Sequence, residues 1–534
     1  MPVKRAIHDS SIRPYQSYQR RRHCWLSRSG RTNPAGYILC PSREDRCEKF
    51  SDRGGRDHPL TPGPSPGPSP RWGEGKVNIK FNSLASAGGE GARRAGEGVG
   101  EGVVRILLRL QGIFTGVAAW SKPVTQSRLM IAVPLMVLLW HVTLEAEDWP
   151  QFLGPTRNGQ YRGPILADSW PKARPPVVWE KEVGQGFSGC VVAQGRLILF
   201  HRVGNQERVE CLEAKTGRPM WSYDYPTHYR DDFGFDEGPR ATPAVDNGQV
   251  YTFGAEGVLH CLDLATGKKI WGVDTHQRFA VSKGFFGAAC SPLVDGGRVL
   301  LNVGGTSQAG LVAFDRENGK VLWTATNDEA SYSSPLVAII EGARHAFFFT
   351  RSGLADVDPT TGQVRFQFPW RARIRASVNA ATPLVVGDLV FLSASYETGA
   401  VLLQVKGNQV KQVWSSDEVM SNHYATSVYH NGYLYGFHGR QEFGPSFRCI
   451  ELKTGKVQWS IDQFKAGTVT LAGNTLLVLK EDGELVLALA SPKEFRPSAH
   501  ARVLPGTVRS YPAIADGYLY ARNQRTLVCV NLRK

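Results

Sequence analysis

Five acidic side chains recur in a fixed pattern that could support carboxylate chemistry. Each is followed four positions later by Gly and eight positions later by a large aromatic residue. The five groups are Glu213, Gly217 and Trp221; Asp263, Gly267 and Trp271; Asp315, Gly319 and Trp323; Asp358, Gly362 and Phe366; and Glu451, Gly455 and Trp459. Carboxylates gathered at one place can act in acid–base catalysis or bind Ca²⁺. These acids instead occupy five equivalent places, which favours a structural role in turns.

The spacing of the five glycines indicates a repeat. Successive glycines lie 50, 52, 43 and 93 positions apart, so the last gap contains one further unit with an irregular turn. A period of this size is typical of repeat architectures. In each turn the acid can accept backbone hydrogen bonds and the Gly can adopt the left-handed conformation. The aromatic residue then falls on the outermost strand, where we expect it to pack against the next unit.

Each unit contains four short strands with alternating apolar residues, as in ATPAV, QVYTFGA, VLHCLDL and KKIW, with turns DNG, EG and ATG between them. The segments that hold the eight first strands begin at Gly189, Ala241, Cys290, Ser333, Ala381, Ala425, Gly467 and Tyr511. The pattern predicts an all-β fold, an eight-bladed β-propeller of four-stranded antiparallel blades. The last blade lacks residues for its fourth strand. We expect a strand over 177–183, with Trp179 in the aromatic position, to complete that blade and close the ring.

The segment CLDLATGKKIW and its counterparts resemble the pyrroloquinoline-quinone-like (PQQ-like) propeller repeat. This repeat is shared by quinoprotein alcohol dehydrogenases and the outer-membrane protein assembly factor BamB. The resemblance covers residues 177–532, and the segment EDWPQFLGPTRNG, from Glu147, resembles the stretch before the propeller in envelope proteins with this repeat. The resemblance implies a propeller over 177–534, with residues 147–176 as a lead-in segment. It does not fix an activity, because one fold hosts many functions.

The first 127 residues differ from the rest of the chain in composition. They include the tract HPLTPGPSPGPSPRWGEG, whose Pro, Gly and Ser content predicts disorder. We expect this leader to be absent from the mature protein. Residues 1–130 hold 22 Lys and Arg against 10 Asp and Glu, so only +3 of the net charge of +15 belongs to the remainder. Nucleic acid is therefore not an expected partner.

An apolar run of 14 residues, Leu129–Val142, follows Lys122 and Arg128. This length suits the core of a signal peptide better than a membrane span. We expect a signal peptide over 128–146, export to the periplasm or cell envelope, and no stable membrane span after cleavage. An uncleaved anchor is the alternative. Six cysteines follow, at two repeat positions, and we expect small buried side chains rather than disulfides.

A quinoprotein dehydrogenase would use PQQ with Ca²⁺, and the resemblance also implies a disulfide between adjacent cysteines and sometimes a C-x-x-C-H haem motif. The chain contains no adjacent cysteines and no C-x-x-C-H. Its one G-x-S-x-G match, residues 63–67, falls in the Pro-, Gly- and Ser-rich tract that predicts disorder and so does not indicate a hydrolase, and the chain lacks the H-E-x-x-H motif of zinc proteases. We therefore assign no catalytic residue and no metal ligand.

The residues just before each first strand should converge at the mouth of the ring. They are unusually polar and aromatic, and suit an anionic or planar ligand or an extended peptide. The candidate binding residues are Arg240, Tyr332, Arg375, Asn379 and His423, with Phe285, Phe286, Arg373 and Asn422 nearby. The alternative is that Arg240, Asn379 and His423 only satisfy backbone groups between blades.

Two functions remain open. The first is an exported binding or scaffolding module of the cell envelope, with an unknown protein or small molecule bound at the mouth. The second is a PQQ-dependent dehydrogenase acting on alcohols or polyvinyl alcohol.

Overall fold

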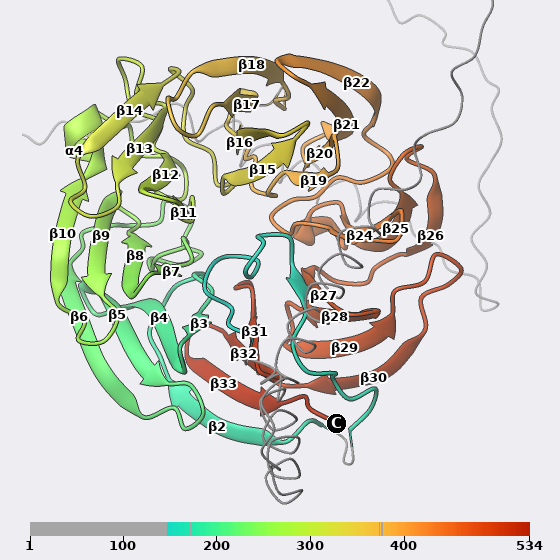
Figure 1. Ribbon diagram of the computed structural model, residues 1–534. Helices are drawn as coiled ribbons and strands as arrows, with labels where there is room; N and C mark the ends of the chain where they lie inside the picture. Colours follow the sequence, from blue (N-terminus) through green and yellow to red (C-terminus); the bar gives the residue numbers. More distant parts are fainter. Residues whose placement is uncertain (1–146, 171–173, 373, 375–376) are drawn as a thin grey trace, which may run out of the picture. The chain divides into compact units, whose positions relative to one another are not determined.

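The predicted propeller is confirmed by the computed structural model, which describes residues 147–170, 174–372, 374 and 377–534. Within this part of the chain, eight sheets surround a central axis (Figure 1). The expected leader (1–127) and signal peptide (128–146) lie outside the described residues. Among the residues that are described, no helix has the length and apolar character needed to cross a membrane.

Seven sheets are built on four consecutive antiparallel strands. Blades 1 to 4 contain β3 (Val191–Ala193), β4 (Arg196–Val203), β5 (Gln206–Glu213) and β6 (Pro219–Pro226); β7 (Ala244–Asp246), β8 (Gln249–Phe253), β9 (Val258–Asp263) and β10 (Lys269–Asp274); β11 (Leu293–Asp295), β12 (Arg298–Asn302), β13 (Leu311–Asp315) and β14 (Val321–Ala325); and β15 (Leu336–Ile340), β16 (Ala343–Phe349), β17 (Gly353–Val357) and β18 (Val364–Pro369). Blades 5 to 7 contain β19 (Leu384–Val386), β20 (Leu389–Ala394), β21 (Gly399–Lys406) and β22 (Gln409–Ser416); β23 (Val428–His430), β24 (Tyr433–His438), β25 (Ser446–Glu451) and β26 (Val457–Ile461); and β27 (Gly467–Ala472), β28 (Thr475–Lys480), β29 (Glu484–Leu489) and β30 (Pro497–Arg502). Two short helices, α4 (Thr275–Phe279) and η2 (Gln441–Phe443), lie in connections.

Blade 8 joins the two ends of the propeller. It combines β31 (Ala513–Ala515), β32 (Tyr518–Arg522) and β33 (Thr526–Asn531) with β2 (Val177–Glu182) as the outer strand. Strand β2 pairs with β33 in antiparallel register, with Trp179 opposite Cys529. The predicted closing strand is therefore confirmed, and it ends one residue before the expected boundary.

The outer strand of every blade carries a register shift at the same place. In each blade one residue beside the aromatic position has no partner on the third strand, as expected for a β-bulge. In blade 2 the unpaired residue is Ile270, next to Trp271. A repeated bulge bends the edge strand and increases its twist, which suits a ring of blades with protected edges.

In six of the eight blades a tryptophan follows the bulge and docks on the next blade, as predicted. The Trp221 indole N–H donates to the Leu264 carbonyl oxygen at 2.9 Å, and Trp271 donates to Arg316 at 2.9 Å. The same bond recurs from Trp179 to Ala214, from Trp323 to Pro359, from Trp414 to Leu452 and from Trp459 to Ser491. Trp414 belongs to the unit whose turn is irregular. The aromatic position is therefore kept in a blade that lacks the acid and the Gly of the repeat.

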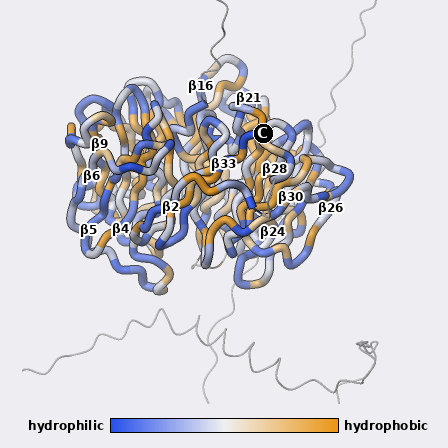
Figure 2. Tube along the Cα trace, turned by 90° about the horizontal axis from the view of Figure 1, so that it is seen from below, coloured by the Kyte–Doolittle hydropathy of each residue, from blue (hydrophilic) through white to orange (hydrophobic). Residues whose placement is uncertain are grey.

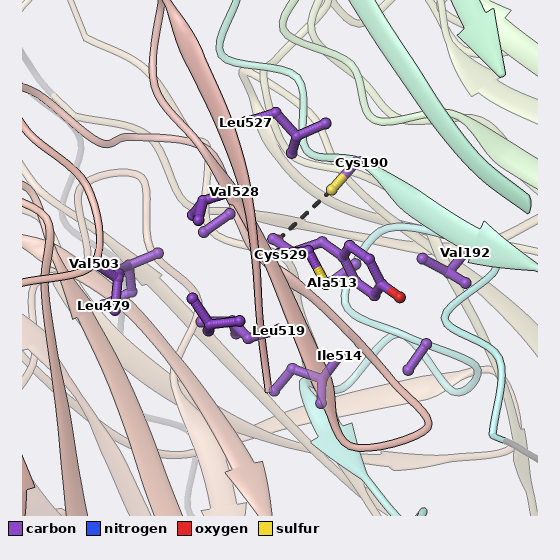
Figure 3. Close-up of a cluster of buried hydrophobic side chains, with 14 of the residues drawn as sticks. Cys190, Val192, Leu479, Val503, Ala513, Ile514, Leu519, Leu527, Val528 and Cys529 are labelled. Atoms are coloured by element: carbon purple, nitrogen blue, oxygen red, sulfur yellow. Dashed lines mark hydrogen bonds between the residues drawn. The ribbon is translucent and has the colours of Figure 1, made fainter. Parts of the chain in front are cut away.

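The apolar core lies between neighbouring blades, and Figure 2 shows hydrophobic chain within the blades and largely hydrophilic loops around them. The largest cluster lies where blades 7, 8 and 1 meet (Figure 3). In it, the Cys190 thiol lies 3.6 Å from the Tyr520 carbonyl oxygen. All six described cysteines are buried and free, which confirms the expectation of buried side chains without disulfides.

The strand order gives the propeller two distinct faces. The mouth face carries the connections from each outer strand to the next inner strand, together with the turns between second and third strands. The opposite face carries the turns between first and second strands and between third and fourth strands. All five acid–Gly turns belong to the opposite face.

The lead-in segment, residues 147–170 of the described chain, lies across the inner ends of the blades on the opposite face. Its strand β1 (Gln160–Tyr161) pairs in parallel with β27, as a fifth strand of blade 7. No strand was predicted here. Hydrogen bonds join the segment to blades 1, 2, 3, 6, 7 and 8 through the pairs Trp149–Val192, Pro150–Val245, Arg157–Pro292, Gln160–Tyr429, Gly159–Leu471 and Tyr161–Gly517.

Candidate functional site

The five turn acids bind their own turns. Asp263 Oδ1 accepts hydrogen bonds from the Thr266 backbone N–H at 2.8 Å and from its hydroxyl at 2.6 Å. Asp358 Oδ1 accepts from the backbone N–H groups of Thr360 and Thr361. Hydrogen bonds from the Thr266 side chain and backbone lower the pKa of Asp263. This geometry supports the structural role expected for these carboxylates.

Arg240 lies on the mouth face, in the connection between β6 and β7. Its guanidinium group donates to Asp231 Oδ1 at 3.2 Å and to the Asp236 carbonyl oxygen at 3.0 Å, both in the same connection. The group also lies against the rings of Phe187, Tyr229 and Phe286, 5.5–5.7 Å from each ring centroid. Arg240 therefore shapes the loop that carries it and supports the aromatic side chains around it.

The mouth face carries a cluster of aromatic rings, which we call the mouth aromatic cluster. Its members pack at centroid distances of 5.1–6.4 Å and are Phe233, Phe235, Phe285, Phe286 and Tyr332. The Tyr332 hydroxyl accepts a hydrogen bond from the Phe286 backbone N–H at 2.9 Å, and burial raises the pKa of Tyr332. Phe233 and Phe235 are each 44% exposed. The cluster thus joins a half-buried base to an exposed apolar tip.

Asn379 is buried and joins blades 4 and 5. Its side-chain amide donates to the carbonyl oxygens of Thr350 and Trp370, and its own carbonyl accepts from Tyr332 and Ser333. These bonds match the alternative in which the residue satisfies backbone groups between blades. The candidates Arg373 and Arg375 lie outside the described residues.

His423 forms a second centre on the mouth face, between blades 5 and 6. Its Nε2 atom lies 2.9 Å from the Tyr396 hydroxyl, and its Nδ1 atom is hydrogen-bonded to Gln441 Oε1. Burial lowers the pKa of His423 to about 4, so the ring is neutral at pH 7. Because Gln441 Oε1 can only accept, Nδ1 carries the proton and Nε2 accepts from Tyr396. His423 and Gln441 also line a small, shallow pocket.

Arg509 is a mouth residue that was not predicted. It immediately precedes Ser510 and Tyr511, so it occupies in blade 8 the position that Arg240 occupies in blade 2. Its guanidinium group lies 5.6 Å from the Phe187 ring centroid and 5.4 Å from that of Phe235. Aligning the residues before all eight first strands would have found it, because Arg240 and Arg509 each stand four residues before the first strand of their blade and three residues before a Pro.

The charges at the mouth are largely compensated. Four arginines each pair with a carboxylate, and the pairs are Arg240–Asp231, Arg351–Glu329, Arg440–Glu442 and Arg509–Glu481, at 2.8–3.2 Å. Such paired groups give orientation and specificity more than a strong net field. The mouth therefore combines exposed aromatic surface with oriented but balanced charges.

The residues at the mouth do not fit PQQ with Ca²⁺. In the described part of the chain, no three His, Cys, Asp or Glu side chains lie close enough together to hold a metal ion. The carboxylates near the axis are instead engaged by arginine side chains. No reaction step through a quinone follows from this arrangement.

Comparisons with known proteins agree with the repeat. A family model described as outer membrane protein assembly factor BamB matches residues 205–461. The dehydrogenase subunit of the quinone-dependent alcohol dehydrogenase of Gluconobacter oxydans is 34% identical over 138 residues, which are 23% of this chain and 17% of that protein. The quinohemoprotein alcohol dehydrogenase of Comamonas testosteroni is 25% identical over 179 residues, 31% of this chain and 24% of that protein.

The chain thus aligns with about a quarter or less of the length of these two relatives. The crystal structure of the Comamonas testosteroni enzyme superposes with a TM-score of 0.53 and 15% identity, over 73% of this chain and 81% of that one. At this identity the likeness concerns the fold.

Proposed function

Because the chain is a PQQ-like β-propeller, related to both the quinoprotein alcohol dehydrogenases and BamB, we propose that it is an exported binding or scaffolding module of the cell envelope. Its mouth face binds the partner, and the propeller itself carries out no chemistry. The observation that carries this proposal is the exposed tip of the mouth aromatic cluster, Phe233 and Phe235.

An exposed aromatic pair on a rigid base is well suited to protein recognition. Aromatic residues are enriched in the energetic centres of interfaces, where surrounding polar groups exclude water. Here the rings of Phe285, Phe286 and Tyr332 support the pair from below. Arg509 and the Lys283–Asp232 pair lie at its border. The supporting rings limit the conformational entropy that Phe233 and Phe235 lose on binding.

The envelope location is supported by the relatives and by the sequence. The matching family is described as an outer membrane protein assembly factor. The apolar run Leu129–Val142 has the composition of a signal-peptide core. Both point to export, and the partner is then an envelope protein or a small molecule that reaches the envelope.

Site-specific photo-cross-linking tests the binding face. A photoreactive phenylalanine analogue at Phe233, in cells that make the protein, should give a discrete adduct on irradiation. The matched control places the analogue at Ile339, which is 70% exposed at the end of β15 nearer the opposite face. Equal products from both positions, or none from Phe233, would contradict the proposal.

The dehydrogenase alternative is tested by adding PQQ with Ca²⁺ and following both thermal unfolding and dye reduction across a panel of alcohols. We expect no rise in melting temperature and no dye reduction, because the mouth lacks a fitting set of carboxylates. A clear thermal shift with alcohol-dependent reduction would replace the binding-module proposal with the enzyme.

A further inference from the structure

Arg509 is held in one orientation by three contacts. The faces of Phe187 and Phe235 lie 5.6 and 5.4 Å from the guanidinium carbon, and the Nε–H donates to Glu481 Oε1 at 2.8 Å. Glu481 is fixed in turn by the Tyr424 hydroxyl, which donates to the same oxygen at 2.9 Å. An arginine fixed in this way loses little side-chain entropy when its remaining donors bind a ligand.

The terminal nitrogens of Arg509 differ from those of its counterpart, Arg240. In Arg240, Nη1 and Nη2 both donate within their own loop, and the side chain is 10% exposed. In Arg509, Nη1 and Nη2 donate to no group among the residues that the structure describes, and the side chain is 21% exposed. Of these two equivalent arginines, Arg240 therefore has both terminal nitrogens hydrogen-bonded. Arg509 has two terminal nitrogens that can donate to a ligand; these two nitrogens are called its free edge.

That free edge matches a carboxylate. The Nη1 and Nη2 groups of a guanidinium can donate two parallel hydrogen bonds to the two oxygens of one carboxylate, an arrangement that is shorter and stronger than a neutral pair. Phe235, which stacks on Arg509, belongs to the exposed tip of the mouth aromatic cluster together with Phe233. A ligand with its carboxylate on Arg509 therefore has apolar surface available beside it.

We propose that Arg509 is the carboxylate-recognition group of the mouth, and that the ligand carries this carboxylate on an apolar or aromatic group. The proposal rests on the mouth being the binding face and names the ligand chemistry there. A free aromatic acid and the C-terminus of a peptide with an apolar last residue share this chemistry.

The test measures binding of defined probes to the purified protein by ligand-observed NMR. The probes are 3-phenylpropionate and acetyl-Gly-Ala-Phe, each compared with its amide, and inorganic phosphate. We expect both acids to bind at least ten-fold more tightly than their amides, and phosphate to bind more weakly than the acids. Tighter binding of the peptide acid would identify a peptide C-terminus as the source, and tighter binding of 3-phenylpropionate would identify a small acid.

Variants assign the effect to one residue. R509Q, which keeps a polar side chain of similar length, should lower acid binding at least ten-fold, to the level of the amide, while R509K keeps part of it. The control R525A removes an exposed arginine from the β32–β33 turn of the same blade and face, and should change acid binding less than two-fold. Equal melting temperatures exclude a folding defect.

The outcomes also separate this proposal from the binding-face proposal. If acid and amide bind equally, or if R509Q leaves acid binding unchanged, Arg509 is not the recognition group. The absence of acid binding at 10 mM concentrations likewise overturns it. In each of these cases a cross-link from position 233 would still support the mouth as the binding face.

Discussion

His423 is a half-buried residue whose protonation state should affect the stability of the mouth. Its two ring nitrogens are committed, Nδ1–H to Gln441 and Nε2 to the Tyr396 hydroxyl. Protonation would place a second N–H against a hydroxyl group that already donates, inside a site with little water. The neutral ring is thus part of the folded arrangement of blades 5 and 6.

The pH dependence of stability should report on His423. Burial lowers its pKa from 6.5 to about 4, so the unfolded chain binds a proton first as the pH falls. The stability that this residue contributes is complete above pH 6.5 and is lost as the pH falls toward 4, by roughly 3 kcal/mol. In H423N, whose amide can donate and accept but does not titrate, the melting temperature should fall less between pH 7 and pH 4.5. Parallel curves for both proteins would contradict this assignment.

At the scale of the element, the ring is assembled by a joint between a tryptophan and a glycine. The bulge in each outer strand precedes the aromatic position, and the ring then covers the turn of the next blade. Glycine is needed in that turn for two reasons, a positive φ and the close approach of the indole. At Gly217, φ is +71° and an added Cβ would lie 2.7 Å from the Trp179 ring.

A pair of substitutions separates these two reasons. Gly195, also in blade 1, has a φ of +72° but no atom within 4 Å of an added Cβ. G195A should therefore cost only the backbone strain, about 1 kcal/mol. G217A should cost that strain and a further 1–3 kcal/mol or so for the steric conflict with Trp179. Equal losses in unfolding free energy, measured by denaturant titration, would show that the joint does not depend on close packing.

The fold could be predicted from the sequence because each blade is local. The alternation within ATPAV, QVYTFGA and VLHCLDL and the turns between them are set by residues close in the chain, and the repeat multiplies the signal. The arrangement of the mouth depends on distant partners instead. Glu481, Phe187 and Tyr424 come from three different blades. The residues near Arg509 in the chain therefore do not predict which groups surround its side chain.

The contact between blades 4 and 5 is a second feature that could not be predicted from the sequence. The sequence showed Phe366 in place of Trp, and an irregular turn in the next unit. In the structure a hydrogen bond joins the β21–β22 turn of blade 5 to blade 4 instead. The Glu341 carboxylate of blade 4 accepts it from the Gly407 backbone N–H at 3.2 Å. No pattern in the chain predicted this replacement, because Glu341 lies 66 positions away.

At the scale of the whole propeller, the lead-in segment ties the ring together across its axis. It bonds to six of the eight blades, and Trp149 and Arg157 within it are each 2% exposed. The Arg157 guanidinium donates to the carbonyl oxygens of Ser291 and Pro292 in blade 3. A segment without a predicted strand thus links blades that do not touch one another.

Substitution within the lead-in segment should therefore weaken the whole ring. W149A removes a fully buried indole and should lower the free energy of unfolding by about 3–5 kcal/mol. I165A removes a side chain that is 76% exposed in the same segment and should change it by less than about 0.5 kcal/mol. Calorimetric scans of both variants would test this, and similar melting temperatures would show that the segment is not integral to the ring.

The two ends of the described chain share one face. The Asp516 backbone N–H donates to the Glu147 carbonyl oxygen, and the Arg533 guanidinium pairs with the Asp516 carboxylate, so both ends meet at the β31–β32 turn on the face away from the mouth. A tag fused directly before Glu147 or after Lys534 would consequently attach the propeller to a biosensor chip with its mouth face directed toward the flowing analyte. The path of the chain thus determines how the immobilised propeller is oriented, and both tag positions should give the same measured affinity.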